Sequence, residues 1–199
     1  MLTVYHRVND KIVISSLSGD ATLPQDIAWV DGYDITLREA QMLEEQLGIS
    51  VPTHDEIWKN RVLSRFYEEG GNHYMTAAII TKVNSPQPQT SSVTFIISKH
   101  FLVTIRQIAP TSFHNFADWL MLHPQKFKTS SQVLEGLLNE MITRVAHNSE
   151  IVVKELDRLS YIIFSQENER NNKSHISPVG MEEVIRTMGG NGRPEYQNM

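Results

Sequence analysis

The side chains in this sequence that could do chemistry are carboxylates that occur in close pairs. They are Asp55-Glu56, Glu68-Glu69, Glu155 with Asp157, and Glu182-Glu183. Carboxylate oxygens, together with water, are the ligands that a hard divalent cation such as Mg2+ prefers. Because most acidic pairs are simply solvated surface, a cation site here requires a further acid brought close by the fold.

Other kinds of catalytic or binding site find no support in the residue pattern. The eight histidines never fall at a metal-ligand spacing such as i,i+4 on a helix. No Gly-x-Ser-x-Gly elbow is present, and the glycine-rich stretch at 189–192 lacks the lysine and the preceding strand of a phosphate-binding loop. There is no cysteine, which excludes thiolate chemistry. We therefore expect no catalytic residue, no organic cofactor and no enzymatic activity.

Composition and hydropathy limit the partners of the chain. Its net charge is −5, so no basic surface is expected to bind nucleic acid. The N-terminal segment lacks the apolar core of a signal peptide. The longest apolar runs, such as 77–80, are far shorter than the ~20 residues needed to cross a bilayer. The sequence as given is expected to be soluble.

A long helix is predicted from about residue 129 to residue 169. Thr129 and Gln132 have the spacing of a capping box at its start. At 1.5 Å per residue it would span roughly 60 Å, which exceeds the width of a small domain. We expect it to serve as a coiled-coil arm or as a stalk toward another part of the protein. Its predicted apolar face consists of Leu134, Leu138, Met141, Val145, Val152, Leu156, Leu159 and Ile163.

Strands and helices alternate before this helix. Asn9-Asp10 predicts the turn of an N-terminal hairpin, and a capping box of Thr36 and Glu39 begins a helix that ends at Gly48. Further strands are predicted at 27–31, 62–68, 73–83, 93–98 and 101–106, and further helices at 54–59, 112–122 and 181–188. The strands 93–98 and 101–106 are almost continuously apolar, which indicates a sheet covered on both faces.

These elements predict an α/β fold: an αβα sandwich with a mixed central sheet over residues 1–128, followed by a long helical arm over 129–199. Four stretches, in this order and spacing, also resemble one family. They are Trp29-Val30-Asp31 with the helix 43–48, the segment 64–69, the strands 93–97 and 101–106, and the long helix containing Leu156-Asp157.

The family is that of the CorA-type divalent cation transporters, whose cytoplasmic N-terminal domain these stretches resemble; ZntB-like zinc transporters are its sister branch. The resemblance covers most of residues 1 to about 170, and 184–192 resembles the start of the family's stalk helix. It implies a homopentamer, membrane helices after the stalk, and a permeation path for Mg2+, with Co2+ or Ni2+ as surrogates, or for Zn2+ in the sister branch. It also implies that the domain senses intracellular cation and gates the membrane pore. It also places the domain at the cytoplasmic face of the inner membrane.

The sequence departs from the family at its C-terminal end. The Gly-Met-Asn signature of the family is absent, since Gly180-Met181-Glu182 does not match it, and membrane segments are absent as well. We therefore interpret the chain as a cytosolic fragment or a truncated product. A free-standing coiled-coil interaction module is the alternative.

The resemblance also implies where a regulatory cation would bind. The family uses carboxylates just before the strand that here carries Arg65. Alignment from the preceding helix places this pair at Asp55 and Glu56, which are the candidate metal ligands. Alignment back from Arg65 places it at Trp58-Lys59, which cannot bind a cation. A further acidic position of the family falls at Thr143 or Arg144, so both an intact and a degenerate site remain open.

Overall fold

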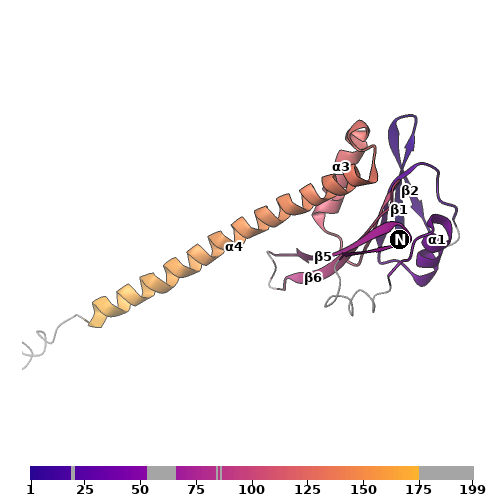
Figure 1. Ribbon diagram of the computed structural model, residues 1–199. Coiled ribbons are helices and arrows are strands. Elements are labelled where there is room, and N and C mark those ends of the chain that lie inside the picture. Colours follow the sequence, from indigo (N-terminus) through magenta and orange to yellow (C-terminus); the bar gives the residue numbers. More distant parts are fainter. Residues whose placement is uncertain (19–20, 53–65, 84, 86, 175–199) are drawn as a thin grey trace, which may run out of the picture. The chain divides into compact units, whose positions relative to one another are not determined.

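The computed structural model describes residues 1–18, 21–52, 66–83, 85 and 87–174 (Figure 1). The chain divides into two compact units, Met1–Ser149 and Glu150–Met199. Helix α4 (Ser130–Ser174) begins in the first unit and continues into the second. The long helix predicted from the sequence is therefore confirmed.

The first unit is built on one seven-stranded mixed sheet. Its strand order is β2-β1-β3-β7-β6-β5-β4. Strands β3 and β7 run parallel, and every other neighbouring pair is antiparallel. The strands are β1 (Leu2–Val8), β2 (Lys11–Leu17), β3 (Ile27–Tyr33), β4 (Phe66–Glu69), β5 (Asn72–Thr81), β6 (Gln89–Ile97) and β7 (Leu102–Arg106).

Two hairpin turns follow directly from their residue types. Asn9 and Asp10 between β1 and β2 have φ angles of 48° and 60°, and Gly70 and Gly71 between β4 and β5 have 58° and 77°. Two consecutive positive φ angles are typical of a type I′ turn, which Asn, Asp and Gly adopt most readily. The turn predicted at Asn9-Asp10 is confirmed.

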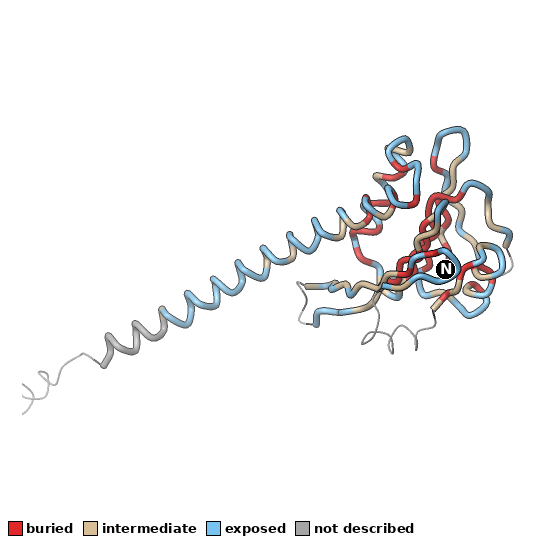
Figure 2. Tube along the Cα trace, viewed as in Figure 1, coloured by how far each residue is buried: buried red, intermediate tan, exposed pale blue. Residues whose placement is uncertain are grey.

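Helices cover both faces of the sheet, as Figures 1 and 2 show. Phe95 and Ile96 are adjacent in β6 and point to opposite faces, and both are fully buried. Phe95 belongs to a core with α3 (Thr111–Leu122) and the start of α4. Ile96 belongs to a second core with α1 (Leu37–Leu47). The predicted αβα sandwich is confirmed.

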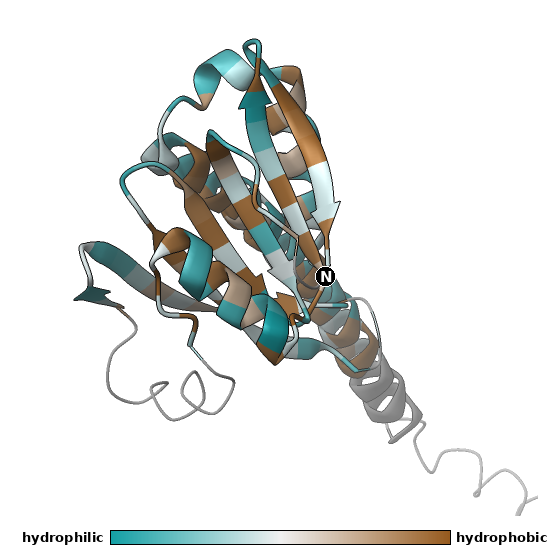
Figure 3. Cartoon of the chain, turned by 90° about the vertical axis from the view of Figure 1, so that its right-hand side faces the viewer, coloured by the Kyte–Doolittle hydropathy of each residue, from teal (hydrophilic) through white to brown (hydrophobic). Residues whose placement is uncertain are grey.

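Helix α1 is fixed at both ends by the residues predicted to cap it. The Glu39 backbone N–H donates to the Thr36 hydroxyl at 3.2 Å, and the Thr36 backbone N–H donates to the Glu39 carboxylate at 2.8 Å. The N-terminal ammonium of Met1 also lies 3.2 Å from that carboxylate. Burial alone would raise the pKa of Glu39, but these hydrogen bonds outweigh it and lower the pKa. Figure 3 shows the outer, hydrophilic surface of this helix.

The start of α4 packs differently from the prediction. Val133 and Leu137 are its fully buried side chains, whereas the predicted Leu134, Leu138 and Met141 are only partly buried. At Gly136 a Cβ atom would lie 2.5 Å from the Phe116 ring and 2.6 Å from the Phe127 ring. The helix backbone therefore approaches these rings so closely that a larger residue at this position would have to displace one of them. The expected cap is present, because the Thr129 backbone N–H donates to Gln132 Oε1 at 3.1 Å.

One further predicted element differs from the structure, and three lie wholly or partly outside the described residues. Strand β6 begins at Gln89 and not at the predicted residue 93, because pairing with β5 continues as far as Thr81 opposite Gln89. The predicted helices 54–59 and 181–188 and the predicted strand residues 62–65 lie outside the described residues.

Candidate functional site

The candidate metal ligands Asp55 and Glu56 lie outside the described residues, as do Trp58 and Lys59 of the alternative alignment. Among the described residues, no three His, Asp or Glu side chains are grouped so that they could hold a metal ion. Thr143 and Arg144, at the further position implied by the family, are both exposed on α4.

The described acidic pairs have partners of their own. Glu68 lies 3.9 Å from His73, and Glu69 accepts a hydrogen bond from the Ser50 hydroxyl at 3.3 Å. On α4, Glu155 forms an ion pair with Arg158, with an N–O distance of 2.7 Å. Arg158, through its hydrogen bond to Glu155, lowers the pKa of that carboxyl. The Glu155 carboxylate is thus ionised and paired with Arg158 on the same helix.

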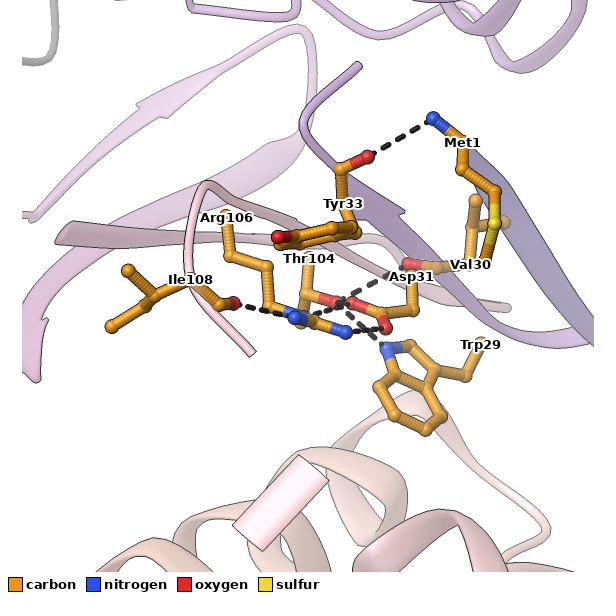
Figure 4. A network of polar contacts seen from close by, with 8 residues as sticks. All are labelled: Met1, Trp29, Val30, Asp31, Tyr33, Thr104, Arg106 and Ile108. Atoms are coloured by element: carbon orange, nitrogen blue, oxygen red, sulfur yellow. Dashed lines mark hydrogen bonds and ion pairs between the residues drawn. The ribbon is translucent and has the colours of Figure 1, made fainter. Parts of the chain in front are cut away.

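A buried polar network lies where the parallel strands β3 and β7 end (Figure 4). Arg106 Nη2 lies 2.7 Å from Asp31 Oδ2, and its Nε donates to Asp31 Oδ1 at 2.9 Å. The Thr104 hydroxyl donates to the same Oδ1 at 2.9 Å and accepts from Trp29 Nε1 at 3.0 Å. Asp31 is only 5% exposed, so its charge depends on these donors.

Two aromatic rings and a backbone carbonyl surround the Arg106 guanidinium at this end of the sheet. Its guanidinium lies 4.9 Å from the Tyr33 ring centroid and 4.8 Å from that of Phe113, and it donates to the Ile108 carbonyl. Open α/β sheets commonly bind ligands beyond the carboxyl ends of their strands. Here the protein's own arginine occupies that place, and both Asp31 oxygens are engaged. We therefore interpret the network as a structural ion pair.

Tyr5 extends this network toward the core. Its ring stacks on Trp29 with the centroids 4.6 Å apart. Burial, reinforced by the Asp31 carboxylate, raises the pKa of Tyr5 to about 12. The phenol is consequently neutral at physiological pH and adds no second charge beside Asp31.

An exposed apolar surface runs along α4 within the second unit. We call it the α4 stripe and define it as Val152, Leu156, Leu159 and Ile163. Their exposed fractions are 45%, 58%, 45% and 56%. The alternating spacing of four and three residues is that of a coiled-coil seam, whose side chains insert between those of a second helix. Figure 2 shows this part of α4 as exposed.

No helix in the described part of the chain combines the length and the apolar character needed to span a bilayer. The exposed apolar residues of α4 are interrupted by charged ones such as Lys154, Asp157 and Arg158. Charged side chains at these positions would be costly in the apolar core of a bilayer.

A comparison with protein families finds one family model, described as "CorA-like Mg2+ transporter protein", that matches residues 24–183. Among curated proteins, the magnesium transport protein CorA of Campylobacter jejuni is 21% identical over 179 residues, covering 85% of this chain and 55% of that protein. The CorA of Blochmanniella floridana is 24% identical over 164 residues, covering 81% of this chain and 49% of that protein. The chain thus spans about half the length of these relatives.

Solved structures share the fold. The complete CorA magnesium transporter of Methanocaldococcus jannaschii matches with a TM-score of 0.56 at 19% identity, covering 93% of this chain and 55% of that one. The ZntB cytoplasmic domain of Vibrio parahaemolyticus matches with a TM-score of 0.58 at 13% identity, covering 78% of this chain and 63% of that one. The sandwich followed by a long helix is thus a fold that these proteins share.

Proposed function

Because the chain belongs to the CorA-like Mg2+ transporter protein family, we propose that it forms the cytoplasmic domain of a divalent metal cation transporter. In this proposal the cargo is Mg2+, with Co2+ or Ni2+ as surrogates, and the pore is a membrane part that the described residues do not contain. Residues 1–128 supply the sandwich, and residues 129–199 supply the helical arm that leads toward the membrane at the cytoplasmic face.

The α4 stripe is the observation that supports this proposal most. Fully burying one aliphatic side chain of this size stabilises a protein by about 1.5–3 kcal/mol. The four side chains of the α4 stripe are each about half exposed. A partner helix that covered them would therefore be stabilised by several kcal/mol of additional apolar burial. A helix with this surface is suited to pack against other helices, as the stalk of a homopentamer requires.

We propose that cation sensing acts through differential affinity between two states of the assembly. Each chain carries a net charge of −5, so close packing of several copies brings like charges together. Divalent cations bridging acidic surfaces of neighbouring subunits would favour the closed state, and their loss would loosen the assembly. A zinc transporter of the ZntB-like branch would use the same domain, and a free-standing coiled-coil module would use only the α4 stripe.

At protein concentrations at which it is monomeric, the chain should bind Mg2+ no more tightly than about the millimolar range, because two carboxylates alone in water attract a cation weakly and the partner acids belong to another subunit. At a ligand concentration equal to Kd, the stabilisation is only about 0.4 kcal/mol. For a protein of this size, such a gain raises Tm by about 1 °C. The measurement is a thermal melt with and without millimolar Mg2+.

The variants of this experiment identify the ligands. A large upward shift of Tm that Asp55→Ala/Glu56→Ala abolishes would contradict weak binding and would place an intact site within one chain. The matched control is Glu68→Ala/Glu69→Ala, which removes the same charge elsewhere. If both double variants reduced the Mg2+-induced rise in Tm equally, the rise would come from unspecific screening of charge, which would contradict a role for Asp55 and Glu56.

A further inference from the structure

A cavity of about 510 Å3 lies where the parallel strands β3 and β7 begin, at the end of the sheet opposite the Asp31–Arg106 pair. Segments from four parts of the chain line it: the end of β1, the loop before β3 with the first residue of that strand, the turn between β6 and β7, and the two residues before α4. Its charged and aromatic lining residues are Arg7, Asp26, Lys99, His100, Phe101 and Lys128.

The cavity is locally basic although the chain as a whole is acidic. Its lining includes one carboxylate, Asp26, and Arg7 Nη1 lies 3.1 Å from Asp26 Oδ1 and neutralises it. Lys99 and Lys128 are exposed, and no carboxylate among the described residues forms an ion pair with either of them. Two ammonium groups beside a neutralised pair leave an excess of positive charge that attracts anions.

Side chain to backbone hydrogen bonds hold the segments that carry the lysines. Arg7 Nη2 donates to the Phe127 carbonyl at 2.7 Å, directly before Lys128. The Ser130 hydroxyl donates to the Ser98 carbonyl at 2.6 Å, directly before Lys99. Both lysine backbones are thereby fixed at the rim before any ligand arrives, which lowers the entropy cost of binding.

We propose that this cavity binds a small polyphosphate anion, either inorganic or the phosphate chain of a nucleotide. Ammonium groups on two separate segments match an anion with several charged groups better than a single phosphate. The volume is in the range of small-molecule sites, about 300–1,000 Å3. A long nucleic acid would meet the net charge of −5, so a small anion is favoured. The proposal does not depend on cation transport.

The test is isothermal titration calorimetry, in which inorganic tripolyphosphate is added to the whole chain in a buffer that contains EDTA. Saturable one-to-one binding is expected, with inorganic phosphate at least about tenfold weaker because it engages fewer ammonium groups. Lys99→Gln/Lys128→Gln should weaken tripolyphosphate binding about tenfold or more, since each lost charged contact costs about threefold to tenfold. The matched control Lys82→Gln/Lys154→Gln, which removes two exposed lysines outside the cavity, should bind normally.

Three results would overturn the proposal: no saturable binding, equal weakening in both double variants, or inorganic phosphate binding as tightly as tripolyphosphate. Because all four lysines are exposed, the variants should retain the melting temperature of the parent chain, which separates loss of binding from loss of folding. If ATP bound more tightly than tripolyphosphate, and Phe101→Leu removed this difference in affinity, the ligand of the cavity would be a nucleotide. Equal binding of the two would assign an inorganic polyphosphate.

Discussion

Replacing Phe95 with Asp is expected to abolish folding to a soluble protein. Phe95 is fully buried in β6, between Met75 of β5 and Thr104 of β7, and its core includes Phe113 and Leu137. Removing the ring alone costs about 3–5 kcal/mol, and burying an unpaired carboxylate costs several more. The sum approaches the whole stability of a typical domain, about 5–15 kcal/mol. The soluble fraction and the far-UV circular dichroism measure the outcome.

Ile80→Asp is the matched control for this substitution. Ile80 lies on the neighbouring strand β5, but its side chain is 56% exposed. A surface substitution of this kind changes the free energy of unfolding by about 0.5 kcal/mol or less. A soluble Phe95→Asp variant with the native spectrum would show that β6 is not the central, doubly covered strand described above.

Replacing Arg106 with Met should lower the free energy of unfolding by about 3–5 kcal/mol. The change removes a cation and leaves the Asp31 carboxylate buried with the Thr104 hydroxyl as its remaining donor. Breaking a buried pair on one side is costly for this reason, whereas the intact pair contributes little net stability. Urea denaturation measures the change, with the midpoint falling and the slope unchanged.

The double variant Asp31→Leu/Arg106→Met distinguishes this explanation from simple loss of packing. Without the carboxylate no buried charge remains, so at least half of the lost stability should return. A double variant less stable than Arg106→Met alone would mean that Asp31 contributes through other contacts, and the assignment of the network as an ion pair would then be wrong.

Much of the fold was predictable because its signals are local. The capping boxes Thr36–Glu39 and Thr129–Gln132 each join residues three apart, and the turn at Asn9-Asp10 depends on its own two φ angles. Such features require no knowledge of the rest of the molecule. The apolar continuity of β6 and β7 likewise implied helices on both faces of the sheet before any packing was known.

The buried face of α4 could not be predicted in the same way. Val133 and Leu137 form one helical row, and Leu134, Leu138 and Met141 form the next, so periodicity allows either row to face the sheet. The structure selects the first row, where the glycine at 136 lets the backbone approach the aromatic rings. That choice depends on the rings of Phe116 and Phe127, which lie outside the helix whose pattern is being interpreted.

The Asp31–Arg106 network depends even more on long-range contacts. Its two charged residues are 75 positions apart, and only the parallel pairing of β3 with β7 brings them together. The two residues belong to separate stretches of the sequence, and nothing in either stretch identifies the other as its partner. The cation site at Asp55 and Glu56 stays a prediction.

Sedimentation velocity of the whole chain, with millimolar Mg2+ and with EDTA, tests the central claim that α4 works covered by other helices in an assembly. The sedimentation coefficient is expected to rise with protein concentration, and to rise further in Mg2+. Leu156→Glu/Leu159→Glu, which places two charges on the α4 stripe, should keep the chain monomeric without lowering its helix content. A parent chain that stays monomeric at every concentration, or a variant that associates as the parent does, would show that the α4 stripe does not pack against other helices in an assembly.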